Sequence, residues 1–455
     1  MSAGDAQDLT HRRILRVAIP VVLSNATVPI LGAVDTGVVG QLGEAAPIAA
    51  VGAGAIILSS VYWIFGFLRM GTTGLAAQAL GAGDRAELIA LLTRALLIAG
   101  VAGGALIALQ WAIFAGAFRL APTSPKTEAL ARDYMGIRIW SAPAAIAIYG
   151  LTGWLIAQER TGAVLVVQVA MNGANILLDL WFVLGLGFGV AGVAWATFLS
   201  EWAGLTLALW LCRSAFTDAA WRDRAQIFDA VRLRRMIAVN TDILIRSVLL
   251  QATFTSFLLG GGLFGTVALA ANQVLLQFLY ITSYALDGFA FAVEALVGRF
   301  FGAGDRPRLR RAVAMCSVWG LGTVAALALA FAAFGGTLVD VMTTAPDVRG
   351  AARDFLPWMV AAPLVGFAAW MLDGIFIGAT RTRDMRNMML MSAACYVAAF
   401  AALVPVFGNH GLWAALMISF AVRGITLGLR YPALVRAATA GGRPPDPRDI
   451  CEAKT

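Results

Sequence analysis

Apolar runs of about 20 residues recur along almost the whole of the 455-residue chain. A helix of that length crosses the hydrocarbon core of a bilayer, which is about 30 Å thick. Charged residues make up only 13% of the sequence, about half the share found in a soluble domain, so the surplus apolar surface must face lipid. The sequence therefore predicts an all-α polytopic membrane protein with twelve transmembrane helices. We place the spans near residues 14–39, 47–70, 88–112, 134–157, 162–186, 190–212, 236–259, 267–298, 311–335, 353–379, 387–407 and 411–432.

Positive charge is concentrated in alternate gaps between the predicted spans. The basic gaps contain Arg85 and Arg94, then Arg160, the run from Arg213 to Arg235, the run from Arg299 to Arg311, and finally Arg381, Arg383 and Arg386. Most of the other gaps contain no arginine or lysine, and the exceptions are two longer gaps around Lys126 and Arg349. By the positive-inside rule, the basic gaps and both chain ends are expected in the cytoplasm.

The sequence argues against nucleic-acid binding, metal binding and catalysis. The net charge is +8, but the arginines lie in short loops and form no patch interleaved with aromatic residues. The four cysteines have no metal-ligand spacing, and His11 and His410 lie near opposite ends of the chain. No ATP-binding loop and no motif of an enzyme active site is present. Transport by such a chain would have to be driven by an ion gradient, with no cofactor beyond the ion.

The two halves of the sequence repeat each other. The segment GAGDR occurs at 81–85 and again at 302–306, an offset of 221 residues, and the short segments ARD and RT recur at the same offset. This offset relates each helix to the sixth one after it, so the two halves share one topology and a pseudo-two-fold axis along the membrane normal. We predict two six-helix bundles: an N-lobe at 1–212, a cytoplasmic linker at 213–235, a C-lobe at 236–432 and a cytoplasmic tail at 433–455.

A few polar residues stand inside the apolar runs of the N-terminal half. Asp35 lies in the first span, Asn175 and Asp179 lie one turn apart in the fifth, and Thr197 lies in the sixth. A carboxylate at the centre of a bilayer costs about 2.5–3.5 kcal/mol on insertion scales, so we expect a functional reason for it. Together these side chains form a set of oxygen acceptors that suits Na⁺ or a shared proton. The alternative is that both acids lie near the membrane interface and cap helix ends.

The C-terminal half has a different polar set. Asp242 and Arg246 lie one turn apart and are expected to form an intrahelical ion pair, while Asp287 and Glu294 share one face of the eighth span. Asp373 lies in the tenth span. Four acids against one arginine predict an acidic interior that attracts cationic compounds or relays protons. The alternative for Glu294 is a solvated position at the cytoplasmic end.

These segments resemble one known family of transporters. AIPVVLSN and VDTGVVGQLG in the first span, N-x-x-x-D followed by GVAGVAWAT, and the doubled GAGDR are similar to the multidrug and toxic compound extrusion (MATE) family. NQVLLQFLYITSYALDGFAFAVEALVG and DGIFIGATRTRDMRNMM are similar to its DinF-like branch (DNA-damage-inducible protein F). The resemblance implies a MATE/MOP-type fold of six plus six helices around a central cavity, in the bacterial inner membrane.

The resemblance also implies roles for single residues. Asp35, Asn175, Asp179 and Thr197 match the ion-binding cluster of the family, and Pro20 matches the bend in its first helix, although Pro20 and Pro29 could equally be static kinks. Asp287, Glu294 and Asp373 match polar positions of the C-lobe in this branch. The position equivalent to Asp35 in the second half is Ser256, so a C-lobe Na⁺ site of the kind other branches have is not expected.

Our hypothesis is a secondary active antiporter that exports amphipathic, often cationic, organic compounds in exchange for H⁺ or Na⁺, with H⁺ preferred. In this hypothesis, ion binding at Asp35 and Asp179 bends the first helix and expels substrate. We expect the chain to act as a monomer on small molecules in the bilayer. The main alternative is a flippase for lipid-linked sugars, whose cavity usually needs many basic groups; a channel or a membrane enzyme ranks lower.

Overall fold

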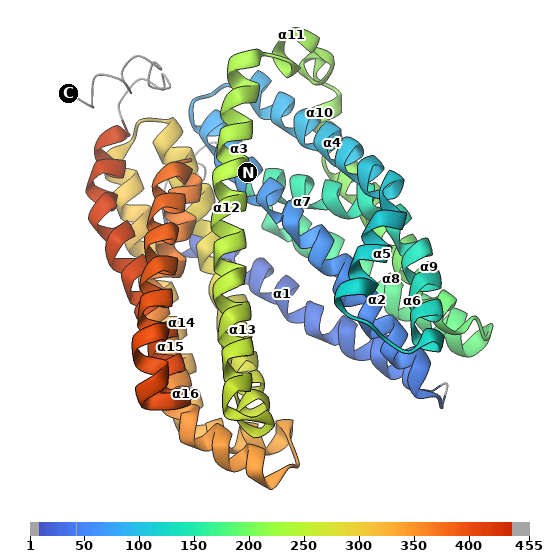
Figure 1. Cartoon of the computed structure of the whole chain (residues 1–455). Coiled ribbons are helices and arrows are strands. Elements are labelled where there is room, and N and C mark those ends of the chain that lie inside the picture. The colour runs from blue at the N-terminus through green and yellow to red at the C-terminus, as the bar shows by residue number, and fades with distance from the viewer. Residues whose placement is uncertain (1–8, 42, 439–455) are drawn as a thin grey trace.

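The computed structural model describes residues 9–41 and 43–438, and these are almost entirely helical (Figure 1). The N-terminal half consists of α1 (His11–Gly40), α2 (Ala45–Trp63), α3 (Phe67–Gly81), α4 (Arg85–Ala108), α5 (Gln110–Leu120), α6 (Pro125–Arg138), α7 (Ala142–Ala157), α8 (Thr161–Asp179) and α9 (Gly189–Leu211). The short helices α10 (Arg213–Phe216) and α11 (Arg224–Ile227) lead into the C-terminal half. That half consists of α12 (Ala230–Gly261), α13 (Thr266–Gly302), α14 (Arg306–Met342), α15 (Pro346–Gly378) and α16 (Thr382–Ala437).

The described helices account for the twelve predicted crossings. Within residues 9–41 and 43–438, nine segments are long and apolar enough to span a membrane by length and composition. Helices α1 and α9 have 30 and 23 residues and are also long enough, but they carry more polar side chains. Helix α16 contains two spans, because Gly408 at φ 57° interrupts its helical backbone. The prediction of an all-α polytopic membrane protein is confirmed.

One boundary differs markedly from the prediction. The second span was expected to end near residue 70, but the helix continues as α3 to Gly81 after a single 3₁₀ turn at Ile64–Gly66. Every residue from Gly71 to Ala79 is buried, because this segment packs against α12, α13 and α15 of the other half as well as against α4 and α7 of its own. The apolar character of α3 therefore reflects packing inside the protein, including contact between the two halves.

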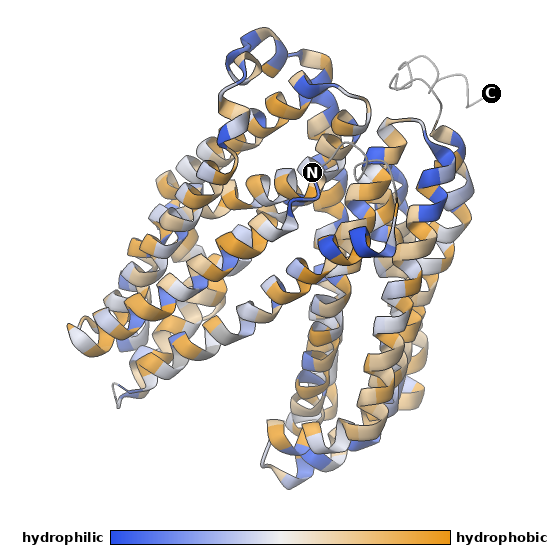
Figure 2. Cartoon of the chain, turned by 180° about the vertical axis from the view of Figure 1, so that it is seen from behind, coloured by the Kyte–Doolittle hydropathy of each residue, from blue (hydrophilic) through white to orange (hydrophobic). Residues whose placement is uncertain are grey.

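The helices form two bundles that meet at one end and diverge toward the other (Figure 1). Helices α1–α9 form the N-terminal bundle, α12–α16 form the C-terminal bundle, and α10 and α11 connect them. We call the end that carries α11 and the arginine-rich loops the basic end, and the other the open end. Apolar residues run along the length of both bundles, and hydrophilic residues gather in the loops (Figure 2). Most of the expected tail, residues 439–455, lies outside the described residues.

The internal repeat is visible in how the bundles pack at the basic end. A Cβ atom on Gly81 would lie 1.9 Å from the carbonyl oxygen of Arg299, and one on Gly302 would lie 2.1 Å from that of Gln78. Both pairs are related by the offset of 221 residues seen in the sequence. Only glycine allows the two backbones to approach this closely. The two copies of GAGDR therefore pack against each other, and the pseudo-two-fold axis passes between them.

Candidate functional site

The four polar residues singled out in the N-terminal half come together between α1, α8 and α9. With its nitrogen turned toward the acids, the Asn175 amide donates to Asp35 Oδ1 and to Asp179 Oδ2, each at 3.2 Å. The oxygen of the same amide then lies 3.1 Å from Thr197 Oγ1. We call these four residues the N cluster.

Local structure explains how the N cluster is assembled. Asn175 and Asp179 occupy the last turns of α8, and the i,i+4 spacing puts both on the face that meets α1 and α9. A turn of π-helix, Leu180–Gly185, follows directly after Asp179. Asn175, Asp179 and Thr197 are buried, while Asp35 is partly exposed. Helix α1, which carries Asp35, runs unbroken from His11 to Gly40 with two prolines inside it, at 20 and 29.

The N cluster has the chemistry of a site for one small cation. The carboxyl groups of Asp35 and Asp179 lie within hydrogen-bonding reach of each other. Two carboxylates this close repel each other when both are charged, which costs free energy. A proton or a metal cation between them lowers that free energy. Oδ1 of Asp179 is buried and has no hydrogen-bond partner among the described residues. This buried oxygen is therefore available to accept from a proton donor or to contact a cation.

An arginine that sequence reasoning missed lies beside the N cluster. Arg138, at the end of α6, is close enough to act electrostatically on both Asp35 and Asp179. Its ion pair, however, is with Glu201 of α9, at 3.0 Å, and its backbone carbonyl accepts from the Tyr62 hydroxyl at 3.0 Å. Within the described residues, the ion pair of Arg138 is thus with Glu201, and neither aspartate of the N cluster forms an ion pair with a basic side chain.

The acids of α13 make contacts across the two bundles. Asn25 of α1 donates from Nδ2 to Asp287 Oδ2 at 3.1 Å. Arg69 of α3 lies 3.4 Å from Glu294 and 4.0 Å above the ring of Phe291. Glu294 is only 1% exposed, so the alternative of a solvated position at the helix end is wrong. Sequence spacing correctly put both acids on one face, and that face is the one that meets the N-terminal bundle.

Two further expectations for the C-terminal half are corrected by the structure. Asp242 and Arg246 do not pair along α12: Asp242 binds Arg386 at 2.6 Å, and Arg246 donates to Asp373 of α15. Arg423 of α16 lies 3.9 Å from the same Asp373 carboxylate. The predicted acidic interior is therefore wrong, because arginines from neighbouring helices pair with Asp242, Glu294 and Asp373, and only Asp287 has no such pair among the described residues. We call Arg246, Asp373 and Arg423 the C cluster.

Charged residues inside apolar runs provide the signal that would have found the missing arginines. Arg138 and Arg423 both lie within predicted spans, where a charge is costly and implies a partner. Arg69 lies at the predicted end of its span, so it resembles a loop residue until the continuation into α3 is known. Glu201 would have been found by the same reasoning as Asp179.

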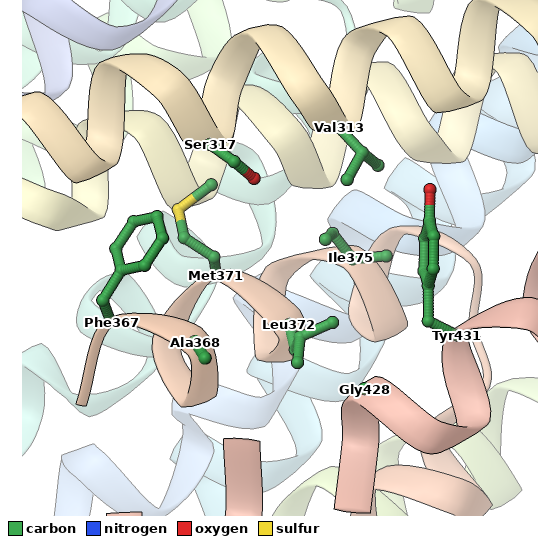
Figure 3. Close-up of a pocket in the computed structure, with 9 residues that line it drawn as sticks. All are labelled: Val313, Ser317, Phe367, Ala368, Met371, Leu372, Ile375, Gly428 and Tyr431. Carbon is green, nitrogen blue, oxygen red and sulfur yellow. The ribbon is translucent and has the colours of Figure 1, made fainter. Parts of the chain in front are cut away.

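The structure also contains two apolar hollows that include none of the predicted site residues. One, of about 220 Å³, lies between α14, α15 and α16 (Figure 3). It is lined by Val313, Ser317, Phe367, Ala368, Met371, Leu372, Ile375, Gly428 and Tyr431. The other, of about 360 Å³, lies between α4 and the linker that follows α9.

Ion pairs connect the two bundles at the basic end. Glu159, in the loop between α7 and α8, binds Arg13 of α1 at 2.5 Å and Arg299 of α13 at 3.0 Å, so it joins the two bundles. Burial raises the pKa of the Glu159 carboxyl, but hydrogen bonds and charge from the two arginines outweigh it, and the pKa lies below its ordinary value. Thr380, the residue 221 positions later, forms the neutral counterpart, accepting from Gln78 at 3.0 Å and Arg235 at 3.2 Å.

Comparisons with known proteins agree on the family. The MatE family model matches residues 20–181 and 244–403. The DNA damage-inducible protein F of Escherichia coli is 37% identical over 433 residues, which cover 92% of this chain and 91% of that protein. A probable multidrug resistance protein NorM of Bradyrhizobium diazoefficiens is 29% identical over 444 residues, with 93% of each chain covered.

Solved structures agree on the fold. The Vibrio cholerae MATE transporter VcmN in its bent form superposes with a TM-score of 0.84 at 18% identity, over 94% of this chain and 97% of that one. A MOP superfamily transporter from Pyrococcus furiosus gives a TM-score of 0.83 at 19% identity, over 94% and 96%. At these identities the likeness concerns the fold alone. The family model and the 37% identity nevertheless show that this chain belongs to the MATE family of membrane transporters, and that it resembles DinF within it.

Proposed function

We propose that this transporter is an efflux antiporter, in which H⁺ or Na⁺ moving down its gradient drives the export of amphipathic, often cationic, organic compounds. The named relatives support this proposal, because several of them are described as multidrug resistance proteins. The observation that carries it is the N cluster. Two carboxyl groups share one amide, and a buried oxygen of Asp179 has no partner among the described residues.

In this proposal, ion binding is coupled to transport through the free-energy cost of leaving the two carboxylates charged without water or a cation. When the cluster is empty, its carboxylates need water, which favours an open and hydrated N-terminal bundle. Binding of a proton, or of Na⁺ to the oxygens of Asp35, Asn175, Asp179 and Thr197, removes that need. Helix α1, with Pro20 inside it, can then bend toward α8 and displace substrate. One charge crossing 100 mV supplies about 2.3 kcal/mol for this step.

The proposal includes an orientation. The linker and the arginine-rich loops gather at the basic end, which is expected to be cytoplasmic by the positive-inside rule. Both chain ends would then be cytoplasmic and the protein would lie in a bacterial inner membrane, acting as a monomer. With this orientation, the bundles diverge outward, and the described structure corresponds to an outward-facing state.

A second candidate is favoured by one specific observation. Arg69, Arg246 and Arg423 bring basic groups into the interior of the transporter, and Nε and Nη2 of Arg423 are buried without hydrogen-bond partners among the described residues. Basic groups suit an anionic headgroup, as a flippase for a lipid-linked sugar would require. The ion pairs with Glu294 and Asp373 argue against it, since they already neutralise part of that charge.

Transport by purified protein in liposomes tests the main proposal. Efflux of a fluorescent organic cation would be measured under a pH gradient or a Na⁺ gradient, each imposed alone. We expect one gradient to drive efflux and Asp35→Asn to abolish it. Asp354→Asn, which removes an exposed acid of α15 at the open end, is the matched control and should leave efflux unchanged. Efflux under neither gradient would favour the flippase, and gradient-driven efflux that persists in Asp35→Asn would overturn the role of the N cluster.

A further inference from the structure

The hollow of about 360 Å³ beside α4 lies where the linker between the two bundles crosses the N-terminal bundle. Its lining is apolar except for one arginine and comes from three turns of α4, from α11 and from the start of α12: Arg94, Leu97, Ile98, Val101, Ala102, Ala105, Ile227, Phe228 and Leu233. From Arg94 to Ala105 the hollow follows α4 for about 16 Å. We call this hollow the groove.

The groove faces outward from the bundle. Val101 is 75% exposed and Leu97 46%, and both are large apolar side chains on α4, which we assign to the membrane, while Phe228, 61% exposed, lies in the linker. Helix α4 packs against α7 through another face, where a Cβ atom on Gly103 would lie 2.5 Å from Pro143. In a bilayer, exposed apolar surface of this kind meets lipid.

Hydrogen bonds and ion pairs hold the linker side of the groove against α4. The buried guanidinium of Arg94 donates to the backbone carbonyls of Ile227 at 2.8 Å and Gln226 at 2.6 Å, and it pairs with Glu87 at 2.7 Å. Arg232 pairs with the same Glu87. Arg94 therefore holds the linker against α4, and its guanidinium is bound to protein groups.

Two exposed arginines near the groove form no ion pair with any described residue. Arg224 precedes Phe228 by one turn, and Arg234 lies on α12 between the exposed side chains of Val231 and Ile237. Both arginines are exposed and have no ion pair or hydrogen bond from the guanidinium within the described part of the chain. The neighbouring acids Asp223 and Asp229 accept backbone N–H groups as the N-caps of α11 and α12, and within the described residues they form no ion pair with either arginine.

From this combination we infer that the groove binds an anionic phospholipid of the leaflet at the basic end, with an acyl chain along α4 and the phosphate at Arg224 and Arg234. An apolar groove next to exposed arginines at a membrane surface matches such a lipid, whose tail is apolar and whose headgroup is negative. A zwitterionic lipid would fill the same groove without neutralising the arginines. The bound lipid would lie against the linker that connects the two bundles.

Lipid binding to the purified full-length protein tests this inference. Native mass spectrometry would compare phosphatidylglycerol with phosphatidylcholine, and we expect tighter binding of the former. An arginine at an anionic surface contributes about fivefold to affinity, so Arg224→Ser with Arg234→Ser should weaken phosphatidylglycerol about 30-fold at low salt and leave phosphatidylcholine unchanged. Arg311→Ser with Arg383→Ser removes two exposed arginines elsewhere at the basic end and should have no such effect.

A second pair of variants tests the groove itself. Ala105→Trp fills it from an exposed position and should weaken both lipids. Ala326→Trp places the same side chain at the exposed position 221 residues later on α14 and should weaken neither. Equal binding of the two lipids, or unchanged phosphatidylglycerol affinity in the Arg224/Arg234 variant, would overturn the inference. The inference would also be overturned if Ala105→Trp changed the oligomeric state of the protein and left its lipid affinity unchanged. The groove would then be a contact with a second copy of the chain.

Discussion

The two bundles are related by one pseudo-two-fold axis, yet their polar centres are opposite in character. In the N cluster, Asp35 and Asp179 face each other around the neutral amide of Asn175, and the nearest arginine is paired elsewhere. In the C cluster, Asp373 lies between Arg246 and Arg423. One centre has more acids than bases within contact distance, and the other has more bases than acids.

This difference indicates a division of labour. A group of acids without a basic partner changes its free energy strongly when a cation arrives, whereas an acid already held by arginines does not. Ser256, at the position equivalent to Asp35, bonds to the hydroxyl of Tyr396 at 3.2 Å and carries no charge at all. We therefore expect ion coupling in the N-terminal bundle and structural ion pairing in the C-terminal one.

The largest expected effect is on stability in the C cluster. Asp373→Asn leaves Arg246 and Arg423 buried together without a counter-charge, and loss of one partner from a buried ion pair costs about 3–5 kcal/mol. We expect thermal unfolding in detergent to show this loss. Asp340→Asn, which removes the partner of Arg353 and Arg349 from a more exposed pair, should cost less than about 1 kcal/mol. Equal effects of the two variants would contradict the assignment of the C cluster as structural.

The next effect should be on transport and not on stability. Asp179→Asn removes repulsion from the N cluster, so the unfolding temperature should stay the same or rise. Gradient-driven efflux should fall at least 100-fold, because the remaining carboxyl has lost the partner with which it holds the ion. Measuring both quantities on one preparation separates the roles, and a destabilised Asp179→Asn protein would show that the N cluster is a structural pair like the C cluster.

A smaller effect is expected at the acids of α13. Glu294→Gln leaves the partly buried Arg69 without its counter-charge and should cost about 2 kcal/mol of stability. Asp287→Asn should cost less than about 1 kcal/mol, since the new amide oxygen still accepts from Asn25. If the Arg69 pair matters as inferred, Arg69→Met combined with Glu294→Gln will be more stable than Glu294→Gln alone. Additive losses in this double-mutant cycle would rule out direct coupling.

How well the sequence predicts each site depends on how far apart along the chain its residues lie. Periodic apolar runs and the spacing of Asn175 and Asp179 are local, and the structure follows them closely. The repeat in the sequence even anticipates the backbone, because Glu159 and Thr380 share a positive φ at the common offset. The ion pair between Arg69 and Glu294 joins residues 225 positions apart, and no local pattern specifies it.

The smallest expected effect is a difference in pH dependence between the contacts of Glu159 and those of Thr380, which occupy equivalent positions at the basic end. Because the folded pKa of Glu159 lies below its ordinary value of 4.5, its ion pairs stabilise the protein fully above that pH and lose this contribution as pH falls through the folded pKa. Glu159→Gln should therefore cost about 1–2 kcal/mol at pH 7 and progressively less below about pH 4.5. Thr380→Ala removes the neutral counterpart, so its cost should not change over the same range. Unfolding temperatures of the three proteins between pH 3 and pH 8 provide the measurement, and a cost for Glu159→Gln that is independent of pH would show that the charge of Glu159 does not hold the bundles together.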